Sequence, residues 1–96
     1  DATAAQAAWE LACTYLANPE IGLVVLDEFT YPLKYGWLDL ELVIAALAAR
    51  PPLQHVIITG RTAPEGLIAV ADTVTDMTLI KHAFKAGVKA MPGLEW

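Results

Sequence analysis

The stretch LVVLDE, from Leu23 to Glu28, decides the fold and raises the first question about function. Its four apolar residues are too few for a helix, and two of them are valine, which favours strands. Because the run does not alternate between apolar and polar residues, it is typical of a strand buried on both faces of a parallel sheet. The adjacent acids Asp27 and Glu28 then stand at the carboxyl end of that strand.

Helical and strand patterns alternate outward from this strand. Apolar residues at helical spacing, caps such as Thr3 and Asp39, and prolines that end each pattern place the boundaries. In chain order the sequence predicts a helix over 3–17, the strand over 23–26, a helix over 39–49, a strand over 55–59, a helix that starts at Thr62-Pro64 and carries Leu67, Ile68 and Ala71, and a weaker strand over 73–80. This order predicts an α/β fold with a parallel sheet covered by helices.

The composition excludes several classes of protein. With 96 residues, 56% of them hydrophobic and 18% charged, the chain is one small globular domain or a piece of a larger one. A net charge of -5 with six scattered basic residues argues against nucleic-acid binding. No apolar run approaches the roughly 20 residues that cross a membrane, and no signal peptide is recognisable. The single cysteine, Cys13, fits a reducing compartment; it is expected to be a small residue on a helix face, with a reactive thiol as the alternative.

Polar residues follow the predicted strands, at the edge where open α/β sheets bind ligands. They are Asp27-Glu28, Thr59-Gly60-Arg61 and Lys81-His82. An apolar strand that ends in Asp-Glu is the Walker B pattern, in which a carboxylate holds Mg²⁺ on nucleotide phosphates. A strand end that merely needs polar residues in water would look the same. The partner motif G-x-x-x-x-G-K-[ST], which cradles the phosphates, is absent from the 96 residues.

A second hypothesis explains the same positions. Receiver domains place a phospho-accepting Asp, a Thr or Ser, and a Lys at successive strand ends, as Asp27, Thr59 and Lys81 would stand here. The carboxylate would attack a phosphoryl group while the other two hold its oxygens. A third, non-enzymatic hypothesis is an α/β module kept for association.

Other chemistries find less support in the residues. The chain has no serine, which excludes a Ser-His-Asp hydrolase within it, and His55, His82 and Cys13 do not have zinc-site spacing. An aromatic group follows the acidic pair and consists of Phe29, Tyr31, Tyr35 and Trp37. Packing beneath a loop explains such a group, and the alternative is a stacking wall for a large flat ligand.

The longer strings carry a resemblance. VVLDEFTYPLKYGWLDLELVIAAL, HVIITGR, ADTVTDM and KHAFKAGVKAMPGLEW occur in unbroken order over nearly the whole chain. Together they resemble the C-terminal part of the ATP:corrinoid adenosyltransferases of the P-loop-fold class. HVIITGR and the AGVKAMPGLEW tail are more specific than the acidic pair.

The resemblance implies a function and a site. Such enzymes transfer the 5′-deoxyadenosyl group of ATP to the reduced cobalt of a corrinoid (cobalamin), so the nucleophile is the metal and no nucleophilic side chain is expected. By analogy Glu28 would hold Mg²⁺, Asp27 would support it, and Arg61 would contact phosphate or form a structural ion pair. Thr59, Tyr31 and Tyr35 are the other expected binding residues.

The resemblance also implies the setting of the site. Residues 1–96 would form the C-terminal part of a single three-layer, RecA-like P-loop domain whose phosphate loop precedes them. The fragment alone would be inactive. A cytoplasmic homodimer supplied with electrons by a reductase is expected.

Overall fold

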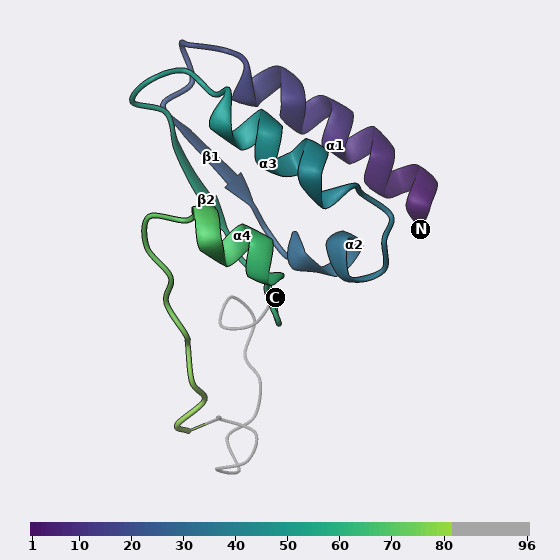
Figure 1. Ribbon diagram of the computed structural model, residues 1–96, viewed down its shortest axis with the longest axis vertical. Helices are drawn as coiled ribbons and strands as arrows, with labels where there is room; N and C mark the ends of the chain where they lie inside the picture. The colour runs from purple at the N-terminus through teal and green to yellow at the C-terminus, as the bar shows by residue number, and fades with distance from the viewer. Residues whose placement is uncertain (82–96) are drawn as a thin grey trace, which may run out of the picture.

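The computed structural model describes residues 1–81, which form a small α/β unit. Figure 1 shows its elements, which are α1 (Ala2–Leu16), β1 (Leu23–Leu26), α2 (Thr30–Lys34), α3 (Leu40–Ala48), β2 (His55–Ile58) and α4 (Glu65–Val70). The predicted alternation of helices and strands is confirmed as far as α4. The short helix α2 lies where the sequence indicated only a loop.

The two strands pair in parallel, as predicted. Leu23 pairs with His55 and Leu26 pairs with Ile58, so the strands run side by side over their whole length and end together. A parallel pair needs a crossover connection, and α2 and α3 supply it between β1 and β2. The residues that follow the two strands are therefore neighbours in space.

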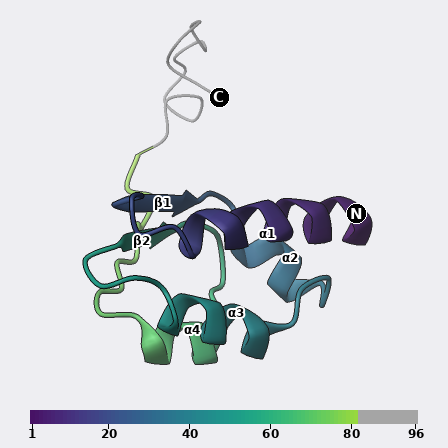
Figure 2. The same ribbon diagram turned by 90° about the horizontal axis from the view of Figure 1, so that it is seen from above.

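The core lies between the sheet and the helices. Val24 and Leu26 of β1 point into it, and Val43 of α3 is fully buried at 0% exposure. Its buried hydrophobic members are Leu16, Val24, Leu26, Phe29, Leu38, Val43, Leu47 and Leu67. Because α1, α3 and α4 all contribute to this one cluster, they cover the same face of the sheet, and Figure 2 shows α3 and α4 side by side there.

The expectation of strands buried on both faces is wrong for the residues described. Burial alternates along β1, and Leu23 and Val25 remain 53% and 54% exposed, with Ile57 of β2 at 50%. The physical reason is that no helix among residues 1–81 packs on that face. One apolar face of the sheet is thus left open in this part of the chain.

The predicted strand over 73–80 is also wrong. Residues 71–81 have no regular structure and are exposed throughout, and Figure 1 shows the segment leaving α4 and running away from β1 and β2. A strand needs a neighbour for its backbone hydrogen bonds, and β-branched residues alone do not supply one. The predicted helical turn near the C-terminus and His82 lie outside the described residues.

Helix boundaries follow local hydrogen bonding. The carboxylate of Asp1, rather than Thr3, caps α1 by accepting from the amide of Ala4 at 2.9 Å. Asp39 caps α3 as predicted, accepting from the amide of Glu41 at 2.9 Å. The last helix begins at Glu65 and not at Thr62, because Thr62 has a left-handed backbone with φ of 53°.

The buried side-chain amide of Gln54 connects the segments that precede the two strands. The side chain of Gln54 is 4% exposed, and its Nε2 donates to the carbonyls of Tyr15, Asn18 and Ile21 at 3.1, 3.3 and 3.1 Å. These carbonyls line the turn that leads from α1 into β1, while Gln54 itself directly precedes β2. The amide therefore aligns the starts of the two strands.

Candidate functional site at the strand ends

The site is built where β1 and β2 end together. The hydroxyl of Thr59 donates to Asp27 Oδ1 at 2.6 Å and accepts from the backbone amide of Glu28 at 3.0 Å. A distance of 2.6 Å is typical of a hydroxyl bonded to a charged carboxylate. The expectation that Asp27 and Thr59 meet at adjacent strand ends is therefore confirmed.

Further hydrogen bonds join the two strand ends into one unit. The Thr59 amide donates to the Leu26 carbonyl at 3.1 Å, and the Phe29 amide donates to the Thr59 carbonyl at 2.9 Å. One residue later, the hydroxyl of Thr30 donates to the Arg61 carbonyl at 2.8 Å. Thr30 is not predictable as part of this site, because a lone threonine after an aromatic residue carries no signal in a single sequence.

Gly60 is required where the two turns touch. Its φ of 154° disfavours any side chain, and a Cβ at this position would lie under 3.0 Å from the side chain of Thr30. The turn after β2 can approach α2 closely only because this residue has no side chain. Gly60 thus sets the separation between the Arg61 turn and the acidic pair.

The backbone of Glu28, directly after β1, has an unusual conformation. Its φ is 54°, a left-handed conformation that is uncommon for residues other than glycine and recurs at functional sites. Both Asp27 and Glu28 are exposed. Residues 1–81 contain no group of three or more His, Cys, Asp or Glu side chains that would hold a metal ion by themselves.

Two exposed carboxylates nevertheless fit Mg²⁺. This ion prefers oxygen ligands, keeps several of its waters, and is usually held by one or two carboxylates together with substrate phosphates. Asp27 has one oxygen occupied by Thr59 and one left over. The donor set therefore suits a magnesium ion shared with a phosphate-bearing ligand.

The remaining basic residues of the predicted site differ in position. Arg61 is exposed at the end of the turn after β2, next to the acidic strand end. Lys81 is exposed too, but the stretch that precedes it forms no strand. The receiver hypothesis placed Lys81 at a third strand end, and that placement is wrong.

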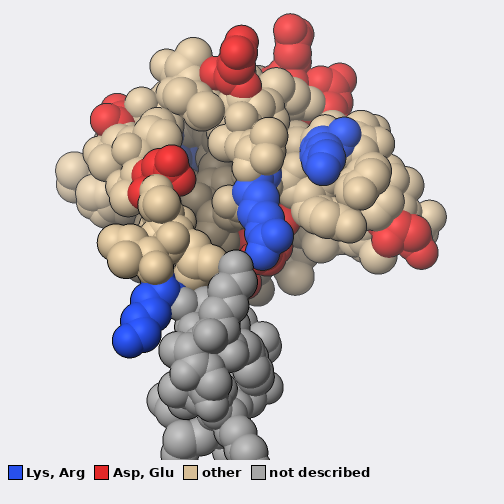
Figure 3. All heavy atoms as spheres, turned by 90° about the horizontal axis from the view of Figure 1, so that it is seen from below, with Lys and Arg blue, Asp and Glu red and all other residues tan. Residues whose placement is uncertain are grey.

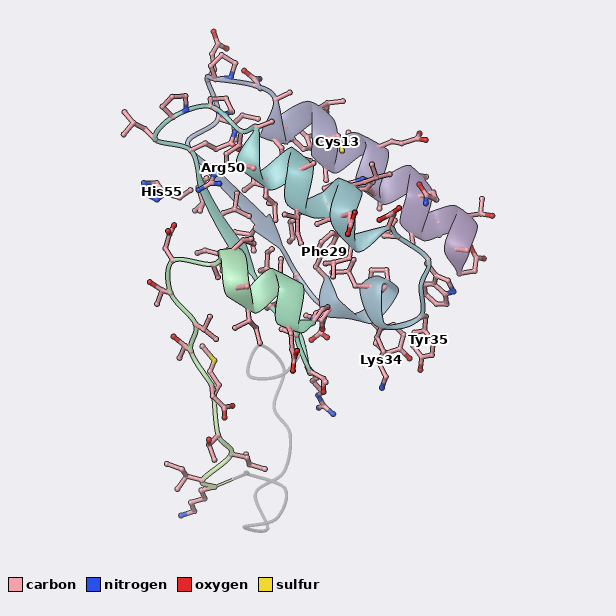
Figure 4. The ribbon with its side chains drawn as sticks, in the orientation of Figure 1. Cys13, Phe29, Lys34, Tyr35, Arg50 and His55 are labelled. Atoms are coloured by element: carbon pink, nitrogen blue, oxygen red, sulfur yellow. The ribbon has the colours of Figure 1, made fainter. Side chains whose placement is uncertain are left out.

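The aromatic group divides into two parts. Phe29 is buried and packs against Trp9 with ring centroids 5.5 Å apart, so core packing explains it (Figure 4). Tyr31, Tyr35 and Trp37 pack on one another, with centroids 4.8 Å apart between the tyrosines and 5.2 Å between Tyr35 and Trp37.

The two tyrosines keep about half of their surface in solvent, at 53% and 51% exposure. Figure 4 shows Tyr35 and Lys34 together at the end of α2, and the ammonium of Lys34 lies 5.8 Å from the Tyr35 ring centroid. A side-chain hydrogen bond with Tyr35 raises the pKa of Tyr31, so the Tyr31 ring stays neutral around neutral pH. The two tyrosines together present an exposed aromatic surface.

Cys13 takes no part in the site. It is half-buried on α1, and burial, followed by the nearby charge of Glu10, raises the pKa of its thiol. A raised pKa lowers the thiolate fraction and therefore the reactivity. This favours the expected role as a small residue on a helix face.

The surface charge is mostly acidic. Figure 3 shows the basic side chains of one face separated from one another, with acidic side chains around its rim. Within residues 1–81, no helix has the length and apolar character to cross a membrane.

Comparison with known proteins assigns the family. The family model described as "ATP:corrinoid adenosyltransferase BtuR/CobO/CobP" matches residues 1–96. Among curated relatives, a corrinoid adenosyltransferase of Pseudomonas aeruginosa is 55% identical over 96 residues, which are 100% of this chain and 47% of the relative. The corrinoid adenosyltransferase CobA of Salmonella typhimurium is 48% identical, and a corrinoid adenosyltransferase of Escherichia coli K12 is 44% identical; in both cases all of this chain aligns with 49% of the relative.

The chain thus spans about half the length of these curated relatives. The matched range includes the acidic strand end, the HVIITGR turn and the C-terminal tail. The resemblance seen in the sequence is confirmed, and the chain belongs to the ATP:corrinoid adenosyltransferase family.

Proposed function

We propose that the complete protein transfers the 5′-deoxyadenosyl group of ATP to the reduced cobalt of a corrinoid, and that residues 1–96 supply the metal-facing strand end. The observation that carries this proposal is the family match over all 96 residues. In the reaction the cobalt attacks the 5′ carbon of ATP with its electron pair. A cobalt–carbon bond forms, the bond from that carbon to oxygen breaks, and triphosphate leaves.

The acidic pair would hold Mg²⁺ on the phosphates of ATP. Glu28, whose carboxylate is exposed at the turn after β1, would be the nearer ligand, and Asp27 would assist through the oxygen that Thr59 leaves free. When bound, the ion neutralises negative charge on the departing triphosphate. The two side chains provide the hard oxygen ligands that this task requires.

Other residues would position the substrates. Arg61 is exposed beside the acidic pair and would contact a phosphate oxygen, for which its planar guanidinium is well suited. Tyr31 and Tyr35 offer an exposed aromatic surface for a large flat ligand. Because the cobalt is itself the nucleophile, the protein acts by alignment and by exclusion of water rather than through a reactive side chain.

The fold proposed for the complete protein is a three-layer P-loop sheet of RecA-like type, of which residues 1–96 form the C-terminal part. Its phosphate loop would lie in the segment that the curated relatives have in addition. The half-exposed apolar residues Leu23, Val25 and Ile57 support this fold, because a sheet face of this composition is normally covered. A cytoplasmic homodimer that receives electrons from a reductase belongs to the same proposal.

The experiment replaces the acids one at a time in the complete protein. Glu28→Gln and Asp27→Asn keep the side-chain shape and remove the charge, and Glu20→Gln serves as a matched control on an exposed acid whose side chain is not part of the site. Formation of adenosylcobalamin from ATP and reduced cobalamin is followed by absorbance over a magnesium titration.

Glu28→Gln is expected to lower turnover at fixed magnesium by roughly 10–100-fold or more, the range seen when residues that support a bound metal are removed. Asp27→Asn should raise the magnesium concentration needed for half-maximal rate, and Glu20→Gln should match the wild type. Equal activity of Glu28→Gln and Glu20→Gln, with both proteins folded, would refute the assigned role of Glu28.

A further inference from the structure

The hydroxyl of Thr59 has no hydrogen-bond donor left for a ligand. A threonine hydroxyl carries one proton. Since the Glu28 amide is itself a donor, Thr59 Oγ1 must accept from it, at 3.0 Å, and its own proton must go to Asp27 Oδ1, at 2.6 Å. While these two bonds persist, Thr59 cannot donate to a phosphate oxygen. Its place next to the acidic pair therefore needs another explanation than contact with the nucleotide.

Thr59 is itself held in place by the sheet. Its amide donates to the Leu26 carbonyl at 3.1 Å and its carbonyl accepts from the Phe29 amide at 2.9 Å. Its β-branched side chain has few rotamers available. The Thr59 hydroxyl is therefore a fixed point relative to the end of β1.

Asp27 gains its orientation from this fixed point. It is exposed at the strand end, and an exposed aspartate without a partner samples several rotamers. The bond through Oδ1 favours one of them and leaves Oδ2 without a bond to Thr59. The second bond, from the Glu28 amide, supports the left-handed backbone of Glu28, with φ of 54°, directly after β1.

We propose that Thr59 is a positioning residue for the metal-facing acids: its hydroxyl holds Asp27 and the Glu28 turn together and does not itself contact ATP. This rests on the proposed function of the acidic pair. It predicts that loss of the hydroxyl weakens metal binding while leaving the metal-independent affinity for ATP unchanged.

The experiment uses Thr59→Val, which keeps the shape and removes the hydroxyl, and Thr59→Ser, which keeps the hydroxyl. Thr14→Val is the matched control, because the Thr14 hydroxyl bonds only the Leu11 carbonyl within α1, at 2.7 Å. Each variant is made in the complete protein. Binding of Mn²⁺ in the presence of ATP is measured by electron paramagnetic resonance, ATP binding without metal by calorimetry, and stability by denaturant unfolding.

Thr59→Val is expected to weaken Mn²⁺ binding about 10–100-fold, as happens when a residue that orients a metal ligand is lost, and Thr59→Ser should restore most of the loss. In an Asp27→Ala background, Thr59→Val should weaken Mn²⁺ binding by less than about a further twofold, because the two residues act as one unit. Metal-free ATP binding should not change, and Thr14→Val should behave as the wild type.

Three results would overturn the positioning role. These are unchanged Mn²⁺ binding in Thr59→Val, a Thr59→Ser variant as impaired as Thr59→Val, and a loss of metal-free ATP affinity, which would indicate direct contact. If Asp27→Ala and Glu28→Gln also bind Mn²⁺ and turn over normally, the proposed function of the acidic pair fails as well. If they are impaired and Thr59→Val is not, only the positioning role fails.

Discussion

Gly60→Ala tests whether the strand ends meet as closely as the structure indicates. Two costs add at this position. The backbone has φ of 154°, a sparsely populated region that a residue with a Cβ adopts at a cost of about 1–3 kcal/mol. The new methyl group would also lie under 3.0 Å from the Thr30 side chain, and such overpacking costs about 1–3 kcal/mol. The expected loss of unfolding free energy is the sum, about 2–6 kcal/mol.

Two other glycines separate these costs. Gly36 has φ of 69°, but a Cβ there meets nothing within 4 Å, so Gly36→Ala should lose only the backbone cost of about 1–2 kcal/mol. Gly22 has open space and no positive φ, so Gly22→Ala should change stability by less than about 1 kcal/mol in either direction. The expected order of destabilisation is Gly60→Ala, then Gly36→Ala, then Gly22→Ala.

The assay is urea unfolding of the complete protein, monitored by the fluorescence of its tryptophans. The unfolding free energies of the variants are compared only if those free energies depend on urea concentration with the same slope. The magnesium titration of turnover is repeated on Gly60→Ala, because a displaced Arg61 turn should also disturb the acidic pair. If Gly60→Ala is no less stable than Gly36→Ala, then the close contact with Thr30 does not exist and the geometry of the strand ends is wrong.

Two further predictions concern residues away from the site. Gln54→Met should lower the unfolding free energy by about 1–3 kcal/mol, because three backbone carbonyls lose a buried donor. Gln54→Glu should lower it further, because it places an acceptor against those carbonyls. A Gln54→Met variant as stable as the wild type would contradict the stabilising role of these three hydrogen bonds. Cys13 should react with a disulfide reagent more slowly in the native than in the unfolded protein at pH 8. The reason is that burial and the charge of Glu10 raise the pKa of its thiol and reduce the fraction of thiolate at that pH. Peptide mass spectrometry measures both reaction rates, and equal rates would contradict the structural role of Cys13.

The local elements were predictable because local signals decide them. The run of four apolar residues fixed β1 at the residues observed, and Asp39 is the N-cap of α3 in both prediction and structure. The parallel pairing followed from the order of strand, helix and strand. These features depend on neighbours along the chain, which a single sequence contains.

The errors concern contacts between distant segments. The β-branched residues of 73–80 favoured a weak strand, but a strand requires a partner, and none pairs with it among residues 1–81. For the same reason, burial of both sheet faces cannot be read from LVVL alone. Likewise, nothing in the sequence indicates that Gln54 reaches three carbonyls more than 30 positions away.

The acidic strand end shows why geometry alone does not choose between functions. A receiver domain and a P-loop enzyme both need an oriented carboxylate beside a hydroxyl at the strand ends, so the bond between Asp27 and Thr59 is compatible with either. The absence of a third strand before Lys81 in the described residues removes one support of the receiver hypothesis. The family match then assigns the ancestry over all 96 residues. What geometry adds is the distribution of hydrogen-bond donors: because the Thr59 proton is already engaged with Asp27, its role can be separated from that of a ligand contact by measuring metal and nucleotide binding apart.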